Sequence, residues 1–197
     1  MGDILAEEKG RLESLLKGNP SRIEPLLFEQ SYETEYVISH GQDSPFFVGL
    51  AFGKLLGTRC GSCNTTYATP KPFCMNCGEK CTWVEMPGVG RIHTFTLCHL
   101  GSEEFLKETP FLLSLIEFDG FETLFLSRLK GIDHSKLGLE WIGRPVSVKF
   151  NPALKDKLEF MRKRKINYKR TEALSPEEKA LIKQMEIRVS DIWFEPV

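Results

Sequence analysis

The chain has 197 residues, 41% hydrophobic and 11% aromatic, which is enough for a globular core and too much for a disordered protein. Its 26 basic and 27 acidic side chains leave a net charge of −1, so no overall field draws it to nucleic acid or to an anionic membrane. The N-terminus lacks the apolar core of a signal peptide, and no uncharged apolar run reaches the roughly 18 residues of a transmembrane helix. We therefore expect a cytoplasmic protein without a membrane-spanning segment.

The composition divides the chain into four parts. We predict a helical and extended N-terminal arm over residues 1–43, a short helix and metal-binding ribbon over 44–86, a β-barrel over 87–150, and a basic segment with a C-terminal helix over 151–197. The arm begins with one amphipathic helix that should stop before Gly18. The apolar residues that follow it either pack on the chain's own core or wrap a partner.

Two Cys-x-x-Cys pairs, separated by ten residues, give the clearest chemical signal. In a reducing compartment they favour a metal site over disulfides, because two such loops can place four thiolates tetrahedrally about 2.3 Å from one ion. Four thiolates close the coordination shell, so the metal should be structural. We predict zinc, with iron as the alternative. The predicted ligands are Cys60, Cys63, Cys74 and Cys77.

Two other cysteines are candidates for a chemical role. Cys81 follows the second pair closely and is either a rival metal ligand or a small buried side chain. Cys98 and His99 resemble a nucleophile and base, but neighbours on a strand point to opposite faces. We therefore expect no catalytic centre in this chain.

The part after the ribbon has the pattern of short strands. Runs of β-branched and aromatic residues occur at 91–97, 111–118, 122–129 and 145–150, and no long helix separates them. Such a series predicts a small β-barrel that is filled by its own side chains. The candidates for the barrel interior are Phe95, Leu113, Leu115, Phe125, Val146 and Val148.

The ordered motifs GKLLGTRCGSCNTTYATPKPFCMNCG, GVGRIHTFT, PFLLSLIEFDG, SRLKGID and IGRPVSVKF resemble the family of rubredoxin-like zinc-ribbon plus OB-fold proteins that accompany thiolases and related acyl-CoA enzymes. The resemblance covers roughly residues 45–150. It implies a mainly β fold with helical arms, in which a zinc ribbon precedes an OB-type barrel. Asn64 stands where family members commonly have glycine, and asparagine also adopts left-handed backbone angles.

The same resemblance implies a function. The chain would be a non-catalytic subunit of a hetero-oligomer, bound to a thiolase-fold enzyme near its acyl-CoA channel. The partner would supply the catalytic residues for thiolysis, condensation or retro-aldol cleavage of an acyl-CoA. The alternative is a single-stranded nucleic-acid-binding protein, because zinc ribbons and OB barrels both serve that purpose.

Candidate contacts with acyl-CoA are basic. Three lie in the predicted barrel, and four form a run whose charges could hold coenzyme A phosphates, meet nucleic acid or simply be solvated. These candidates are Arg91, Arg128, Lys130, Arg162, Lys163, Arg164 and Lys165. The aromatic pair Trp193 and Phe194 near the C-terminus either returns to the chain's own core or anchors in a partner.

Overall fold

The computed structural model describes residues 4–17, 38–39, 41–101, 103–166 and 174–197. The chain forms two compact units, residues 1–36 and 37–197. In the first unit the described element is helix α1 (Ile4–Leu16), which ends at the predicted position and exposes Leu12 and Leu16. Most of the predicted extended stretch of the arm lies outside the described residues.

The second unit begins with helix α2 (Ser44–Ala51), whose first turn carries Pro45, a residue that suits this position because its missing N–H has no helical partner there. A three-stranded antiparallel sheet follows, in the order β2-β1-β3. Its strands are β1 (Leu56–Cys60), β2 (Thr66–Tyr67) and β3 (Cys81–Glu85). The cysteine loops project from the ends of these strands.

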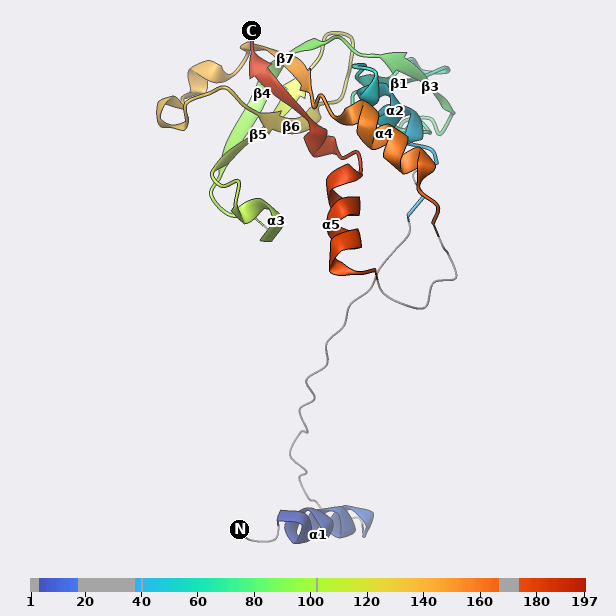
Figure 1. The fold of residues 1–197 in the computed structure, drawn as a ribbon, viewed down its shortest axis with the longest axis vertical. Coiled ribbons are helices and arrows are strands. Elements are labelled where there is room, and N and C mark those ends of the chain that lie inside the picture. Colours follow the sequence, from blue (N-terminus) through green and yellow to red (C-terminus); the bar gives the residue numbers. More distant parts are fainter. Residues whose placement is uncertain (1–3, 18–37, 40, 102, 167–173) are drawn as a thin grey trace. The chain divides into compact units, whose positions relative to one another are not determined.

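Five strands then close a barrel in the order β4-β5-β6-β8-β7 (Figure 1). The strands are β4 (Val89–Cys98), β5 (Phe111–Glu117), β6 (Phe125–Leu129), β7 (Pro145–Phe150) and β8 (Ile192–Pro196). The short helices α3 (Glu103–Leu106), η1 (His134–Lys136) and η2 (Leu139–Trp141) lie in the connections. This five-stranded closed sheet is the OB architecture, so the predicted fold class is confirmed.

Strand β8 was not predicted from the sequence. Helices α4 (Leu154–Lys163) and α5 (Pro176–Met185) and the turn η3 (Val189–Asp191) lead the chain back to the barrel, where β8 pairs antiparallel with β7 and parallel with β6 (Figure 1, red). Ser175 caps α5 in a capping box with Glu178, as its sequence indicated. The last residues of the chain therefore belong to the barrel sheet.

One hydrophobic core joins α2, the ribbon, the barrel and α4. It includes Leu50, Ala68, Ile116, Leu154 and Phe194, all at most 2% exposed. A second, smaller cluster beneath the cysteine loops contains Cys60, Tyr67, Cys74 and Cys81. Because the first core is shared, the ribbon and the barrel form one packed body.

The predicted barrel interior was partly wrong. Phe125 and Val146 are buried, and Phe95 and Val148 pack against the core. Leu113 and Leu115 instead alternate with the buried Leu112, Ser114 and Ile116, so they lie on the outer face of β5. The run FLLSLIEF is apolar in both phases, so its pattern could not show which phase faces inward.

Among the described residues, no helix combines the length and the apolar character needed to cross a bilayer.

Candidate metal centre

The four predicted ligands come together in the ribbon. The sulfurs of Cys60, Cys63, Cys74 and Cys77 all lie within 4.8 Å of one another. The measured separations are 3.5 Å for Cys60 to Cys77, 3.4 Å for Cys63 to Cys74 and 3.7 Å for Cys63 to Cys77. A tetrahedron with metal–sulfur bonds of about 2.3 Å has edges of about 3.8 Å, so these distances fit a single zinc ion.

The two loops that carry the ligands have the same local design. Cys60 ends strand β1, and Cys74 directly follows the bridge between Phe73 and Lys80. Each accepts a backbone hydrogen bond from the residue after the second cysteine of its loop: Asn64 N–H to Cys60 O at 3.1 Å and Gly78 N–H to Cys74 O at 2.9 Å. Both residues have left-handed backbones, with φ of 61° at Asn64 and 79° at Gly78. The predicted tolerance of asparagine at this position is thus confirmed.

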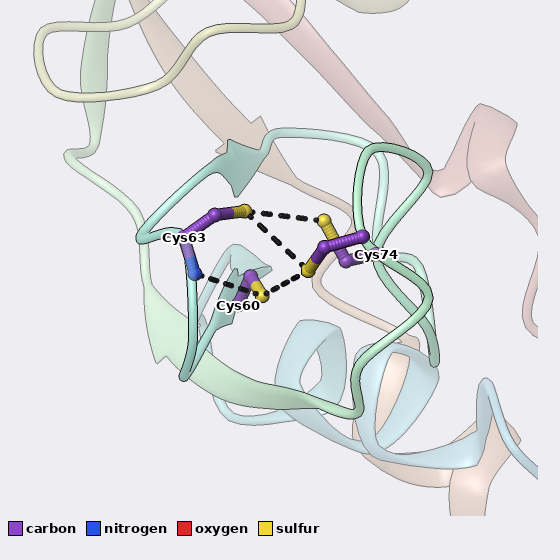
Figure 2. A group of neighbouring side chains, drawn as sticks. Cys60, Cys63 and Cys74 are labelled. Atoms are coloured by element: carbon purple, nitrogen blue, oxygen red, sulfur yellow. Dashed lines mark hydrogen bonds between the residues drawn. The ribbon is translucent and has the colours of Figure 1, made fainter.

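Backbone amides point at the first sulfur of each loop. Cys63 donates its backbone N–H to Cys60 Sγ at 3.4 Å (Figure 2). Ser62 also donates to Cys60 Sγ at 3.4 Å, and Asn76 donates to Cys74 Sγ at 3.4 Å. The hydrogen bond from the Cys63 backbone amide is the main reason why the pKa of the Cys60 thiol is lowered. Such bonds favour the thiolate, which is the form that binds a metal.

Tyr67 was missed by the sequence interpretation. Its hydroxyl lies 3.2 Å from Cys74 Sγ and accepts the backbone N–H of Met75 at 2.9 Å. Donation by this hydroxyl lowers the pKa of Cys74 to about 6, against the effect of burial. The only sequence signal was an aromatic residue between the two cysteine pairs.

Cys81 is not part of the four-sulfur group. It lies opposite Cys60 in the β1–β3 pair and is 7% exposed. Burial, with the neighbouring thiols, raises its pKa. The choice left open by the sequence is therefore resolved in favour of a small buried side chain.

The ribbon is fastened to the barrel by the loop between β5 and β6. Thr66 donates its backbone N–H to Glu122 at 2.6 Å and its hydroxyl to Gly120 O at 2.7 Å, and it also bonds Glu122 through that hydroxyl. Ala68 donates its N–H to the hydroxyl of Thr123 at 2.9 Å. The metal site and the barrel therefore belong to one packed unit.

The basic candidates of the barrel fall in two places. Arg128 lies on β6, and Lys130 directly follows that strand. Strand pairing sets Arg128 opposite Trp193, and the Lys130 ammonium lies 4.2 Å from the centre of the Trp193 ring. The Arg128 guanidinium lies 3.4 Å from the ring of Phe111 and bonds Glu108 at 3.0 Å. Arg91, on β4, is ion-paired with Asp119 instead.

The basic run lies at the end of α4 and after it, and two of its charges are already paired. Lys163 bonds Glu159 within the helix, and Arg164 reaches Glu186 at 3.4 Å. Arg162 and Lys165 are exposed. Two of the four charges of the run are therefore already compensated by carboxylates of the chain itself.

Phe194 needs a correction. It is fully buried and lies 5.9 Å from the Phe118 ring and 6.3 Å from the Phe125 ring. As an inward-facing residue of β8 it fills the barrel, so it is not available as a partner contact. Its neighbour Trp193 lies on the outer face.

Two family models match the chain in sequence. The one described as "ChsH2, rubredoxin-like zinc ribbon domain" matches residues 47–81, and the one described as "ChsH2, C-terminal OB-fold domain" matches residues 83–151. Together they span just over half of the chain. The chain belongs to the ChsH2 family of zinc-ribbon and OB-fold proteins. This confirms the resemblance of the ribbon and barrel motifs, and the ChsH2 zinc ribbon agrees with the four-cysteine site.

Individual relatives are more distant. A "DUF35 domain-containing scaffold protein" of Methanocaldococcus jannaschii is 28% identical over 67 residues, which cover 33% of this chain and 48% of the relative. The matched part thus spans about half the length of that curated relative. The solved structure "Ltp2-ChsH2(DUF35) aldolase" superposes with a TM-score of 0.51 at 21% identity, covering 82% of this ChsH2-family chain and 98% of the other. That likeness shows the shared fold.

Proposed function

We propose that this chain is a non-catalytic, zinc-binding subunit of a hetero-oligomeric enzyme complex in the cytoplasm that acts on acyl-CoA. Its partner would be a thiolase-fold enzyme that supplies the catalytic residues for thiolysis, condensation or retro-aldol cleavage. The observation that carries the proposal is the ordered pair of ChsH2-family domains, ribbon then barrel. The "DUF35 domain-containing scaffold protein" and the "Ltp2-ChsH2(DUF35) aldolase" to which the chain is similar support it.

The chemistry of the metal centre supports a structural role. Residues Cys60, Cys63, Cys74 and Cys77 would hold the zinc ion, and four thiolates leave no position for water or a carbonyl oxygen. The ion would therefore contribute folding free energy, not Lewis acidity. We propose that the chain works in four parts, residues 1–43, 44–86, 87–150 and 151–197. The last part contributes strand β8 to the barrel.

The outer barrel face around Lys130 and Trp193 is the proposed contact with the partner enzyme. The cationic groups of Arg128 and Lys130 lie over the rings of Phe111 and Trp193. These cation–π contacts hold the side chains in a defined position, which suits a binding surface. The proposed contacts with acyl-CoA at this shared interface remain Arg91, Arg128, Lys130, Arg162, Lys163, Arg164 and Lys165.

The nucleic-acid alternative is less well supported. It needs exposed aromatic faces on which bases stack. Phe118 and Phe125 are buried, and Phe95 and Phe121 pack against the core. We therefore do not propose this function.

Co-expression with a thiolase-fold enzyme from the same organism tests the proposal. Size-exclusion chromatography should show one complex that contains both chains. A Trp193→Ala, Lys130→Ala double variant should weaken that complex, whereas Leu139→Ala, which removes an exposed side chain elsewhere, should not. Separate elution of the wild-type chain and the enzyme would contradict the proposal.

A further inference from the structure

A cavity of about 550 Å³ opens where α2, the ribbon and the barrel meet. Neither the metal centre nor the contacts proposed above involve this cavity. Its apolar lining includes Phe46 and Phe47 of α2, Pro70 and Pro72 of the ribbon loop, Leu126 of β6 and Val189 of η3. The volume lies within the range of about 300–1,000 Å³ that is usual for small-molecule sites.

The residues that line this cavity are fixed by contacts with the rest of the protein. Phe46 is 5% exposed; its ring lies 6.2 Å from that of Phe125 and meets Phe47 edge to face at 5.4 Å. On the other side, Lys71 donates its backbone N–H to the buried Thr58 hydroxyl at 2.9 Å. Because the prolines on either side of Lys71 also fix φ, a ligand would meet a preformed wall and would not have to order it.

The polar lining is small and mixed in charge. Gln42 and Thr69 are exposed, so they lie on the solvent side, and Lys71 is half-buried. The other charged residue is Asp43, which lies next to Gln42 at the start of α2. One cation and one anion do not make a phosphate site, whereas amide, hydroxyl and ammonium groups can donate hydrogen bonds to carbonyl oxygens.

We propose that this cavity binds the apolar acyl group of an acyl thioester, with the thioester and the adjoining amide of the pantetheine arm at the mouth near Gln42 and Thr69. This inference rests on the proposed function, since it names the part of the acyl-CoA that the subunit itself holds. Phe46, Phe47 and Leu126 provide apolar lining for the acyl group. The nucleotide end of coenzyme A lies outside the cavity.

The test uses the zinc-loaded full chain and isothermal titration calorimetry below the critical micelle concentration of the ligand. Decanoyl-CoA and decanoyl-pantetheine should bind, and coenzyme A alone should bind at least tenfold more weakly. Val189→Trp places a bulky side chain in the cavity at a residue that is 47% exposed, and it should weaken decanoyl-pantetheine at least tenfold. Leu139→Trp, 81% exposed and outside the lining, is the matched control and should bind as the wild type does.

Three results would overturn the inference. One is equal affinity for coenzyme A and decanoyl-CoA, and another is undiminished binding by both Val189→Trp and Leu126→Arg. The third is absence of decanoyl binding by the wild-type chain; if Val189→Trp then also loses co-elution with the partner enzyme, the cavity is a protein-docking site. A chain that forms the complex but binds no acyl ligand contradicts this inference and leaves the proposed function intact.

Discussion

Thr66 donates its backbone N–H to the carboxylate of Glu122 across 2.6 Å, and this bond joins the zinc ribbon to the barrel. The two residues are 56 positions apart in the chain. The Thr66 side chain bonds the same carboxylate and the carbonyl of Gly120. The orientation of the ribbon on the barrel therefore depends on a few named polar contacts as well as on the shared core.

Replacing Glu122 should loosen this connection. Glu122→Ala removes the acceptor of two bonds and should lower the free energy of unfolding by about 1 kcal/mol, measured by urea denaturation. Glu85→Ala breaks an exposed ion pair with Lys54 and should cost less, because both side chains are more than half exposed. An equal loss in the two variants would contradict the role given to Glu122.

The same bond predicts a dependence of stability on pH. Hydrogen bonds from Thr66 hold the pKa of the Glu122 carboxyl below its ordinary value of 4.5. Its contribution is therefore present above pH 4.5 and is lost as the pH falls through the lower, folded-state pKa. The stability difference between wild type and Glu122→Gln should shrink in that acidic range, and a difference that stays constant there would show that the carboxylate charge has no part in the bond.

Lys157 and Asp191 form a buried ion pair that fixes the approach to β8. Their side chains are only 12% and 7% exposed, and the Lys157 ammonium lies 2.7 Å from Asp191 Oδ1. Lys157→Met leaves a buried carboxylate without its cation and should cost about 3–5 kcal/mol. The control Lys163→Met breaks an exposed pair within α4 and should cost about 0.5 kcal/mol or less. The two losses of stability are measured by thermal unfolding, and equal losses in both variants would contradict the prediction.

Gly57 is required where the ribbon strand β1 crosses the barrel loop. A Cβ added at this position would lie 2.5 Å from the Tyr67 carbonyl oxygen and 2.6 Å from a ring carbon of Phe121. Gly57→Ala should therefore cost about 1–3 kcal/mol through overpacking. Gly61→Ala is the control, since a Cβ there has no neighbour within 4 Å. Chemical denaturation of both variants checks the prediction, which fails if Gly57→Ala is as stable as its control.

The metal centre should contain one zinc ion per chain. Mass spectrometry under native conditions should show it in the wild type, and Cys63→Ser should lose it because three thiolates no longer close the tetrahedron. Cys81→Ser should keep its zinc, because Cys81 lies outside the four-sulfur group. A wild-type chain without zinc or iron, or a Cys81→Ser variant without metal, would contradict the ligand assignment.

Local patterns in the sequence were sufficient for the ribbon, the first four barrel strands and helix α5. The spacing of Cys60 to Cys77 indicated the metal site, and Ser175 with Glu178 indicated where α5 begins. These features depend on residues close together in the chain, so their chemistry can be read without the fold.

The remaining features depend on contacts between distant residues. Ile192 and Phe194 have the apolar character of a strand, but only the pairing with β6 and β7 shows that they belong to this barrel. The outward position of Leu113 follows from the register of β5, which a continuous apolar run does not reveal. Glu122 was predicted only as the first residue of the strand run 122–129, and its bond to Thr66 joins residues 56 positions apart, so no local pattern indicates it.

The most direct test of the central claim is reconstitution of enzyme activity from separate chains. The partner thiolase-fold enzyme is assayed for acyl-CoA turnover alone, with the zinc-loaded chain, and with the Cys63→Ser variant, while the chain is also assayed by itself. We predict that the zinc-loaded chain raises kcat/KM at least about tenfold, that the variant does not, and that the chain alone shows no turnover. Full activity of the enzyme without this chain, or turnover by the chain alone, would contradict the account.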